Sequence, residues 1–431
     1  MISREIQAVL LSKYDIHTFR EEDLASGHLW KTYSFGRPAD NKLIKHIQSR
    51  PELMKYADCD KSGRGYETAS QTIKADKLKG WQALVRLTSR YDPLHLTFPP
   101  DYVYRLGTLG AYDGFRVIVN EGISENSEPQ GMILAQYADT PFCFYRSIYG
   151  IKLSEQEAWC HKALLGVLWS SLARYYFFMT SANWGLWHHK LLLDEVMTLP
   201  VVFDKKNPVI GRVISIVDEL RGYHPEHSSL LRIEDTPGTE IDTRRQDLET
   251  RLDESVFDLY ELSEEQRDLV RDCCSVTLPF FYKPTQSGAG TPAISENDVS
   301  WLSRYAMTFG RRWNPYLGNG EEMRVAIHIG GHRNLVAVEF FPADKDDAWD
   351  FSVEDNSWGH ILEQVSKALP QPMSTSQIVL DGVVHLVTDE AIIIIKRNEK
   401  RFWTKSIARE DADATLCKRM VEPESGDGAR D

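Results

Sequence analysis

The residues that could carry out chemistry are spread thinly along this chain. His224 and His227 are three residues apart, but they lie in a proline-containing loop without further ligands nearby, so we do not expect a zinc site. The chain contains no glycine-rich phosphate loop, no dinucleotide-binding fingerprint, no zinc-protease motif and no nucleophile-elbow serine. We therefore predict no catalytic residue, no bound metal and no cofactor.

The closest approach to a nuclease site lies in the C-terminal part of the chain. Such a site needs clustered carboxylates and a lysine at the end of a strand, and the nearest candidates are Asp381, Asp389, Glu390 and Lys396. Lys396, however, ends the apolar run AIIIIK, which is better explained as a buried strand. A divergent nuclease is therefore an alternative interpretation.

Charge is distributed unevenly along the sequence. The formal net charge is −13, yet residues 31–120 carry 15 lysines and arginines against 9 acidic residues, whereas residues 191–282 carry 10 against 20. A protein with this asymmetry can present a basic face to phosphate while its acidic part keeps it soluble or meets a basic partner. The alternative is a surface that is merely uneven.

The most aromatic stretch of the chain runs from Trp169 to Val201 and divides into two parts. Apolar residues at helical spacing, Trp169, Leu172, Tyr175 and Tyr176, predict the buried face of an amphipathic helix. Polar residues and Gly185 then break the helix and leave a loop that could face DNA. Its candidate contact residues are Asn183, Trp184, Trp187, His188, His189 and Lys190. A packed loop that docks the helix is the alternative.

The predicted elements indicate an α+β protein. Short β-rich runs separated by turns predict a strand-dominated module at about residues 100–152, and a longer period predicts a helical region at about 153–282. Ser263 and Gln266 form a capping-box pattern, so one helix is expected to end near Tyr260 and another to start at Ser263.

The C-terminal part is predicted to form a separate domain. Residues 283–298 are rich in Gly, Pro, Ser and Thr and are predicted to be a linker that buries no core. A smaller α+β domain follows at 299–410, in which HIGGH (residues 328–332) predicts a hairpin turn. The acidic tail at 411–431 is expected to be frayed.

Two features bear on where the protein works. Six cysteines without a CxxC pair or regular spacing are typical of reduced thiols, which indicates a cytoplasmic protein. Arg174 interrupts the aromatic stretch before about 20 apolar residues are complete, so we do not expect a membrane span.

Six segments, taken in order, resemble one protein family. They are LWKTYSFGRPADNKLI, GRGYETA, YRLGTLGAYDGFRVIVNEGIS, FCFYRSIYGIKL, LLGVLWSSLARYYFFMTSANWGLWHHKLLLDEVMTLPV and RLDESVFDLYELSEEQRDLVRD. Together they are similar to the C-terminal target-recognition region of adenine-specific N-6 DNA methyltransferases of restriction-modification and phage-defence systems. The resemblance covers about residues 28–282, and within the 1–282 region it implies a target-recognition module.

The family's catalytic half has no counterpart here. TFPPDYV lacks the Asn or Asp that precedes the two prolines of the family's adenine-binding motif, WNPYLG has a single proline, and no S-adenosylmethionine motif is found. The resemblance therefore implies a component that binds double-stranded DNA and works with a separate methyltransferase or restriction subunit. It is not expected to be an enzyme on its own.

Specific basic residues follow as candidate DNA contacts. Arg105, Arg116, Arg146 and Lys152 lie at the ends of strand-like runs, where side chains can reach out from a rigid scaffold toward phosphates or base edges. The alternative for each is an ordinary solvated charge. For the whole protein, the competing hypothesis is a defence-system scaffold that binds another protein through its acidic helical region.

Overall fold

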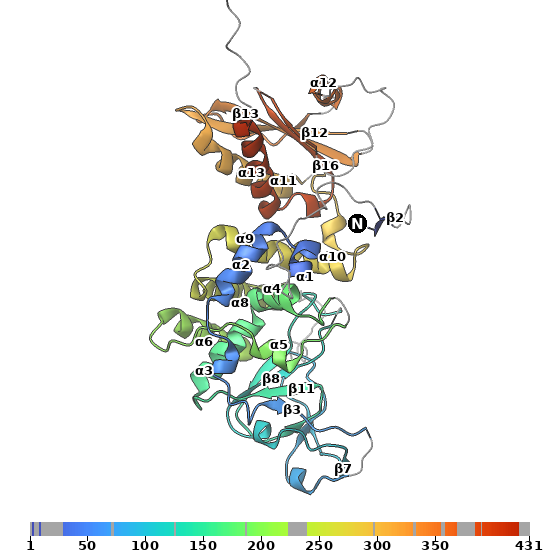
Figure 1. The fold of residues 1–431 in the computed structure, drawn as a ribbon, viewed down its shortest axis with the longest axis vertical. Helices are drawn as coiled ribbons and strands as arrows, with labels where there is room; N and C mark the ends of the chain where they lie inside the picture. The colour runs from blue at the N-terminus through green and yellow to red at the C-terminus, as the bar shows by residue number, and fades with distance from the viewer. Residues whose placement is uncertain are drawn as a thin grey trace, which may run out of the picture. The chain divides into compact units, whose positions relative to one another are not determined.

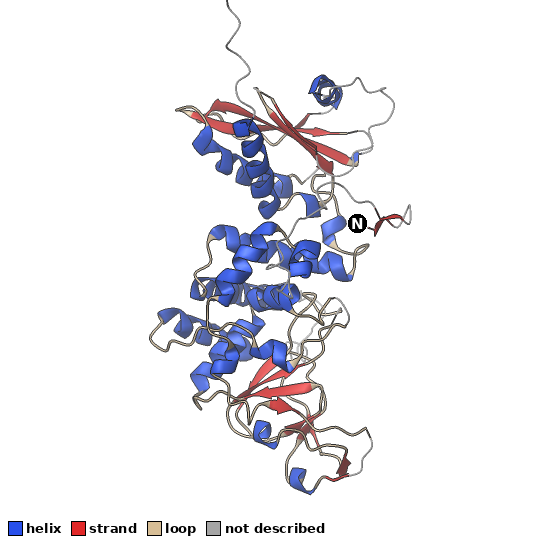
Figure 2. Cartoon of the chain, in the orientation of Figure 1, coloured by secondary structure: helices blue, strands red, loops and turns tan. Residues whose placement is uncertain are grey.

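The computed structural model describes most of the 431 residues. The described ranges are 29–69, 73–124, 126–185, 188–222, 239–295, 298–330, 333–354, 358–368, 384–388 and 390–421, with the short strands β1 (Ile2–Ser3) and β2 (Ala8–Val9). Contacts divide the chain into two units, residues 22–274 and residues 275–431 with 1–21. Each unit combines helices with β-sheet, which confirms the predicted α+β class (Figures 1 and 2). Trp187, His224, His227, Asp381 and Asp389 lie outside the described residues.

An antiparallel sheet forms the centre of the strand-rich part of unit 22–274. Its order is β3 (Gly63–Arg64), β11 (Ile148–Ile151), β8 (Arg116–Asn120) and β9 (Ala135–Ala138), with Ile118 opposite Gly150. Val117, Ile118 and Val119 are all buried, because both faces of β8 are covered. Two smaller sheets flank it: β10 (Cys143–Phe144), β5 (Ala83–Leu84) and β6 (Leu96–Thr97), and β4 (Ile73–Lys74) with β7 (Tyr102–Val103). In the described part of unit 22–274, strands thus begin at Gly63, well before the predicted module at 100–152.

The predicted helix around Trp169 is two consecutive helices, which meet at Ser170. α3 (Ala158–Trp169) ends where the Ser170 side chain accepts a hydrogen bond from the backbone N–H of Ala173, which caps α4 (Ser171–Thr180). Trp169, Leu172, Tyr175 and Tyr176 are buried, as predicted. Helix α3 packs on β8 and β9, and it also contacts α6 (Pro208–Arg221) and α8 (Thr239–Leu259).

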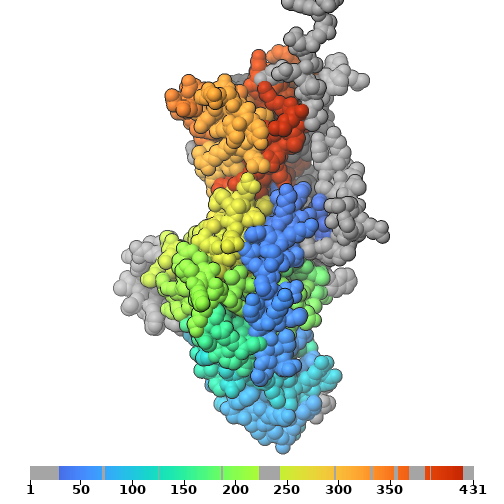
Figure 3. Space-filling model, turned by 60° about the vertical axis from the view of Figure 1, so that its left-hand side comes forward, coloured from blue at the N-terminus to red at the C-terminus, as the bar shows by residue number. Residues whose placement is uncertain are grey.

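The remaining helices of this unit enclose the aromatic core. α9 (Glu264–Asp272) starts with the predicted capping box of Ser263 and Gln266, and α8 ends at Leu259. In Figure 3 the blue surface near residue 45 lies beside yellow surface of the α8–α9 region. His46 Nε2 there lies 2.9 Å from the Tyr260 carbonyl oxygen. The other helices are α1 (Leu29–Phe35), α2 (Pro38–Gln48) and α5 (Leu193–Met197).

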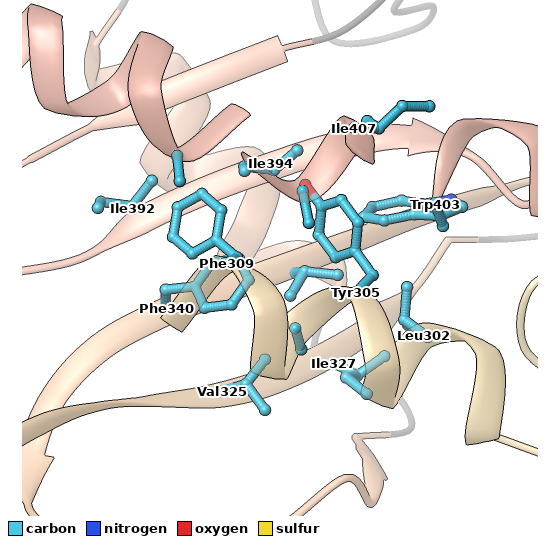
Figure 4. Close-up of a cluster of buried hydrophobic side chains, with 14 of the residues drawn as sticks. Leu302, Tyr305, Phe309, Val325, Ile327, Phe340, Ile392, Ile394, Trp403 and Ile407 are labelled. Atoms are coloured by element: carbon cyan, nitrogen blue, oxygen red, sulfur yellow. The ribbon is translucent and has the colours of Figure 1, made fainter. Parts of the chain in front are cut away.

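The second unit is a sheet with helices on both faces. The strand order is β14 (Val353–Glu354), β12 (Glu321–Ile329), β13 (Leu335–Asp344), β16 (Ile392–Arg397) and β15 (Val384–Val387). Antiparallel pairing of β12 with β13 confirms a hairpin at the HIGGH segment, whose Gly331 and His332 lie outside the described residues. Isoleucines alternate along β16. Ile392 and Ile394 face α11 (Ser300–Trp313) and α13 (Lys405–Val421) (Figure 4). Ile393 and Ile395 face α12 (Trp358–Ala368) on the other side of the sheet.

Two boundaries differ from the sequence-based expectations. The units divide between Cys274 and Ser275, within the π-helical turn η6 (Cys273–Thr277) that precedes α10 (Leu278–Tyr282), and Ala293 and Ile294 of the predicted linker belong to the buried core of the second unit. Residues 405–421 are helical, so the expectation of a frayed tail from residue 411 is wrong for 411–421. Ala408, Ala412 and Leu416 recur every four residues and bury one face of that helix. Among the described residues, no helix is both long and apolar enough to span a membrane.

Candidate nucleic-acid interface

Arg116 does not reach the surface. Its side chain is fully buried, where Nη1 donates to the Gly114 carbonyl at 2.8 Å and Nη2 donates to the Thr140 carbonyl at 2.9 Å. The guanidinium lies 4.3 Å from the centre of the Phe142 ring, and burial lowers the pKa of Arg116 to about 10. Arg116 therefore ties the turn before β8 to the loop after β9. Its predicted role as a contact residue is wrong.

Lys152 is also largely buried. Only 8% of Lys152 is exposed, and its Nζ donates to the Asp113 carbonyl at 2.8 Å. Burial lowers the pKa of the amine. The end of a strand therefore does not by itself place a side chain in solvent. Whether a side chain at the end of a strand is buried or exposed depends on which elements pack against it, and the side chains of Arg116 and Lys152 are both buried.

The loop after α4 is packed at its start and exposed at its end. Trp184 is fully buried with its ring centre 5.7 Å from that of Phe178, and its backbone N–H donates to Ser181 Oγ at 3.0 Å. The buried Lys31 holds this turn by donating to the carbonyl oxygens of Ser181 and Trp184, and burial lowers the pKa of Lys31 to about 7. Trp184 is therefore a core residue, as the packed-loop alternative expected.

The end of the same loop faces solvent beside the sheet. Asn183 is partly exposed, and His188, His189 and Lys190 are exposed. Backbone bonds from Ile123 N–H to the His189 carbonyl (2.8 Å) and from Leu191 N–H to the Glu121 carbonyl (2.9 Å) fasten the loop alongside the chain that leaves β8. This attachment brings Lys190 next to residues of the four-stranded sheet.

Two small clusters of charge each include one residue of the segment 63–67, which begins with β3. In the first, the Glu67 carboxylate pairs with two arginines. Arg146 Nη1 donates to Oε1, and Arg105 Nε lies 3.6 Å from Oε2. In the second, the Glu121 carboxylate lies 3.0 Å from Arg64 Nη2 and 3.9 Å from Lys190 Nζ. We call Arg64, Arg105, Arg146 and Lys190 the basic surface.

The four cations of the basic surface are held but accessible. Their side chains are 50–69% exposed, whereas the carboxylates of Glu67 and Glu121 are 17% and 12% exposed. Each arginine also lies over a tyrosine ring, at 4.9 Å for Arg105 on Tyr104, 5.9 Å for Arg146 on Tyr145 and 5.3 Å for Arg64 on Tyr149. Four positive charges thus stand outside two recessed negative charges, which is an arrangement suited to an anionic partner.

One glycine beside this surface allows two segments of the backbone to approach closely. Gly65 lies between Arg64 and Tyr66, and an added Cβ there would meet the Phe144 carbonyl oxygen at 1.9 Å. Only glycine therefore allows β3 and its continuation to approach the chain at residues 144–145. The prediction from sequence included Arg105, Arg146 and Lys190 but missed Arg64, Glu67 and Glu121. The signal that could have found two of them is the segment GRGYE, an arginine between glycines followed by a carboxylate.

Glu390 and Lys396, the two nuclease candidates that lie among the described residues, do not come together. Glu390 lines an open pocket of about 400 Å³ with Glu339, His328 and His360 on the α12 side of the second unit's sheet. Lys396 lies on the opposite side, buried against Asp411, Tyr305 and Trp403 in the α11–α13 core. Within the described ranges, no group of three or more His, Cys, Asp or Glu is placed to hold a metal ion.

Comparisons with known proteins assign no family. No protein-family model matches the chain, and the search of curated proteins finds no significant match.

Proposed function

We propose that this chain is the DNA-recognition component of an N-6 adenine methyltransferase-based restriction-modification or phage-defence system. In this proposal it acts in the cytoplasm with a separate catalytic subunit. The observation that carries the proposal is the basic surface, which lies within the region that resembles methyltransferase target-recognition modules.

An enzyme that modifies a base must hold the DNA on either side of its target. Such an enzyme flips the target base out of the duplex, so other elements must grip the flanking DNA. Gripping needs guanidinium and ammonium groups at fixed positions, because contacts to phosphates set the register of the protein on the duplex. Arg64, Arg105, Arg146 and Lys190 each pair with a carboxylate that is itself only 12–17% exposed, which restricts their side chains before DNA binds and so limits the entropy lost on binding.

The decisive experiment compares two triple variants of the full chain. Changing Arg64, Arg105 and Arg146 to Ala should weaken DNA binding and lower the slope of log affinity against log salt by up to about 0.9 for each lost phosphate contact. The matched control changes Lys205, Arg212 and Arg251 to Ala. These cations are 54–64% exposed and each pairs with a carboxylate, but they lie in the acidic helical region.

The two variants should melt at nearly the same temperature, since exposed ion pairs contribute about 0–1 kcal/mol each. Equal DNA affinity and equal salt slopes for the two variants would remove the basic surface from the proposal. Absence of DNA binding by the unaltered chain, both alone and with a catalytic subunit encoded beside it, would favour the scaffold alternative.

The scaffold alternative has less to support it than the charge count suggests. In the acidic helical region Arg267 bridges Glu254 and Asp258, and Arg271 bridges Glu254 and Glu264, so part of the negative charge is used inside the unit. The nuclease alternative is not favoured either, because Glu390 and Lys396 lie on opposite sides of one sheet.

A further inference from the structure

We infer that Arg105 reads a guanine in the recognised DNA and that Glu67, itself fixed by Arg146, is the residue that positions Arg105 for this. The inference rests on the proposed DNA-binding function and goes further, because it separates a base-reading residue from cations that serve only to attract phosphate.

The geometry singles out Arg105 among the three arginines. It is the most exposed, at 69%, and the guanidinium nitrogen that lies nearest to the Glu67 carboxylate is Nε, 3.6 Å from Oε2. Arg64 instead directs the terminal nitrogen Nη2 to both Glu121 and the Tyr149 hydroxyl. A guanine edge presents O6 and N7 side by side, and a guanidinium binds them with two parallel N–H groups. The two terminal nitrogens of Arg105 form such a pair, and both lie farther from the Glu67 carboxylate than Nε does.

Glu67 is well placed to orient Arg105. Its side chain is 17% exposed, and Arg146 holds its other oxygen by a hydrogen bond. Its backbone N–H donates to the Arg105 carbonyl at 3.0 Å, and its carbonyl accepts from Tyr104 N–H at 2.6 Å. The backbone of Arg105 and the carboxylate that faces its guanidinium are thus fixed to each other.

The chain that carries Arg146 is joined to the same strand. Arg146 N–H donates to the Tyr66 carbonyl at 2.8 Å, and the Tyr66 and Tyr145 rings meet edge to face at 5.8 Å. Two segments far from Glu67 in sequence, one carrying Arg105 and the other Arg146, therefore converge on its carboxylate. Supporting contacts of this kind are what hold a recognition side chain in its productive geometry.

A carboxylate behind an arginine also selects the kind of group that the arginine meets. Glu67 offsets part of the field that would draw in a phosphate, whereas the edge of guanine is neutral and binds mainly through directed hydrogen bonds. A phosphate contact needs only a positive charge, so lysine can replace arginine there. A bidentate guanine contact cannot be made by lysine in the same way.

The test uses the full chain and a pool of duplexes with a randomised core, from which bound sequences are selected and sequenced. The wild-type protein should require guanine at one position. Arg105→Lys should lose that preference, so that guanine is no longer favoured by the roughly 5- to 150-fold that a bidentate contact provides, while binding to random duplex and its salt dependence stay unchanged. The matched control is Arg64→Lys, which should keep the guanine preference.

The role of Glu67 is tested by the base preference in the selected sequences, which would not change if Glu67 only stabilised the fold. Glu67→Gln should blur the preference at the same position and raise the affinity for random duplex, because a negative charge is removed. The matched variant Glu121→Gln should raise non-specific affinity and leave the preference intact. The two arginines are 50% and 69% exposed and the two carboxylates 12% and 17%, and unchanged melting temperatures will show that all four variants are folded.

The outcomes distinguish failure of the inference about Arg105 from failure of the proposed DNA-binding function. If the protein binds DNA and Arg105→Lys keeps the same guanine preference, the inference is overturned and the proposed function stands. If the unaltered chain selects no sequence from the pool because it binds no DNA, both are overturned.

Discussion

At the scale of single residues, the second unit contains an unusual buried charge, Asp411. Its carboxylate accepts hydrogen bonds from the Tyr305 hydroxyl (2.5 Å) and from Lys396, and it lies 2.8 Å from His385 Nε2. Burial alone would raise the pKa of Asp411, but the charge of Lys396 and the hydrogen bond from His385 lower it to about 2. Removing one partner of an ion pair buried this deeply is strongly destabilising, because the other charge stays buried without a counter-charge.

We predict that Asp411→Asn destabilises the second unit by about 3–5 kcal/mol, because Lys396 would remain buried without a counter-charge. The control is Asp413→Asn two residues away, which removes an exposed pair with Arg312 and should cost at most about 1 kcal/mol. Urea unfolding of both variants measures the difference. A cost for Asp411→Asn no larger than that of the control would show that the buried pair contributes nothing.

The pH dependence of the same group has a definite sign. The folded-state pKa of about 2 lies below the ordinary value of 3.8, so the folded protein releases this proton more readily than the unfolded chain does. The contribution of Asp411 to stability is therefore complete above about pH 4 and is lost as the pH falls toward 2. The acid unfolding curve of Asp411→Asn should be correspondingly shallower over that range.

At the scale of elements, the segment predicted to be a linker is held by one buried side chain. Asn398 Oδ1 accepts from the backbone N–H groups of Ala293 (2.9 Å) and Ile294 (3.1 Å), and Asn398 Nδ2 donates to the Ile294 and Arg333 carbonyls, both at 3.1 Å. The Asn398 side chain thus makes the hydrogen bonds that a neighbouring strand would otherwise make with this segment. A segment rich in glycine and proline can be ordered when another element supplies its hydrogen bonds.

We predict that Asn398→Ala makes residues 283–295 sensitive to protease, because each buried backbone group left without a partner costs about 1–3 kcal/mol. Gln286→Ala, a change at an exposed position of the same segment, should leave the digestion pattern of the native protein unchanged. Limited proteolysis followed by mass spectrometry locates the first cut. Cleavage of the unaltered protein in this segment at the rate of the Asn398 variant would show that the segment is a true linker.

Local patterns predicted the elements better than the faces that their residues occupy. The capping box at Ser263, the buried aromatic face around Trp169 and the buried strand AIIIIK depend on residues close in sequence, and all three are found. The burial of Arg116 depends on Thr140 and Phe142, which another part of the chain brings beside it. Glu67 matters only because two arginines about 40 and 80 residues away converge on it. Sequence periodicity carries no information on such convergence.

At the scale of the whole molecule, the division into two units has a thermodynamic consequence. Unit 22–274 has its own aromatic core, in which Trp169 Nε1 donates to the Ala135 carbonyl at 2.9 Å and the Trp169 ring lies 5.1 Å from that of Tyr91. The second unit has a separate core around Phe309 and Phe340. Units with separate cores can unfold in separate transitions, and a single unfolding free energy then does not describe the chain.

We predict two calorimetric transitions that respond to different substitutions. Trp169→Ala should lower the unfolding free energy of unit 22–274 by about 3–5 kcal/mol, as large truncations in a core do, and so shift the transition of that unit to lower temperature. Asp411→Asn should shift only the transition of the second unit. DNA binding should disappear with the transition that Trp169→Ala shifts, since the basic surface belongs to that unit. With Asp411→Asn, there should be a temperature range in which the second unit has unfolded and DNA is still bound. A single transition that both substitutions shift equally would mean that the two cores unfold as one, and loss of DNA binding with the second unit would place part of the binding energy outside the basic surface.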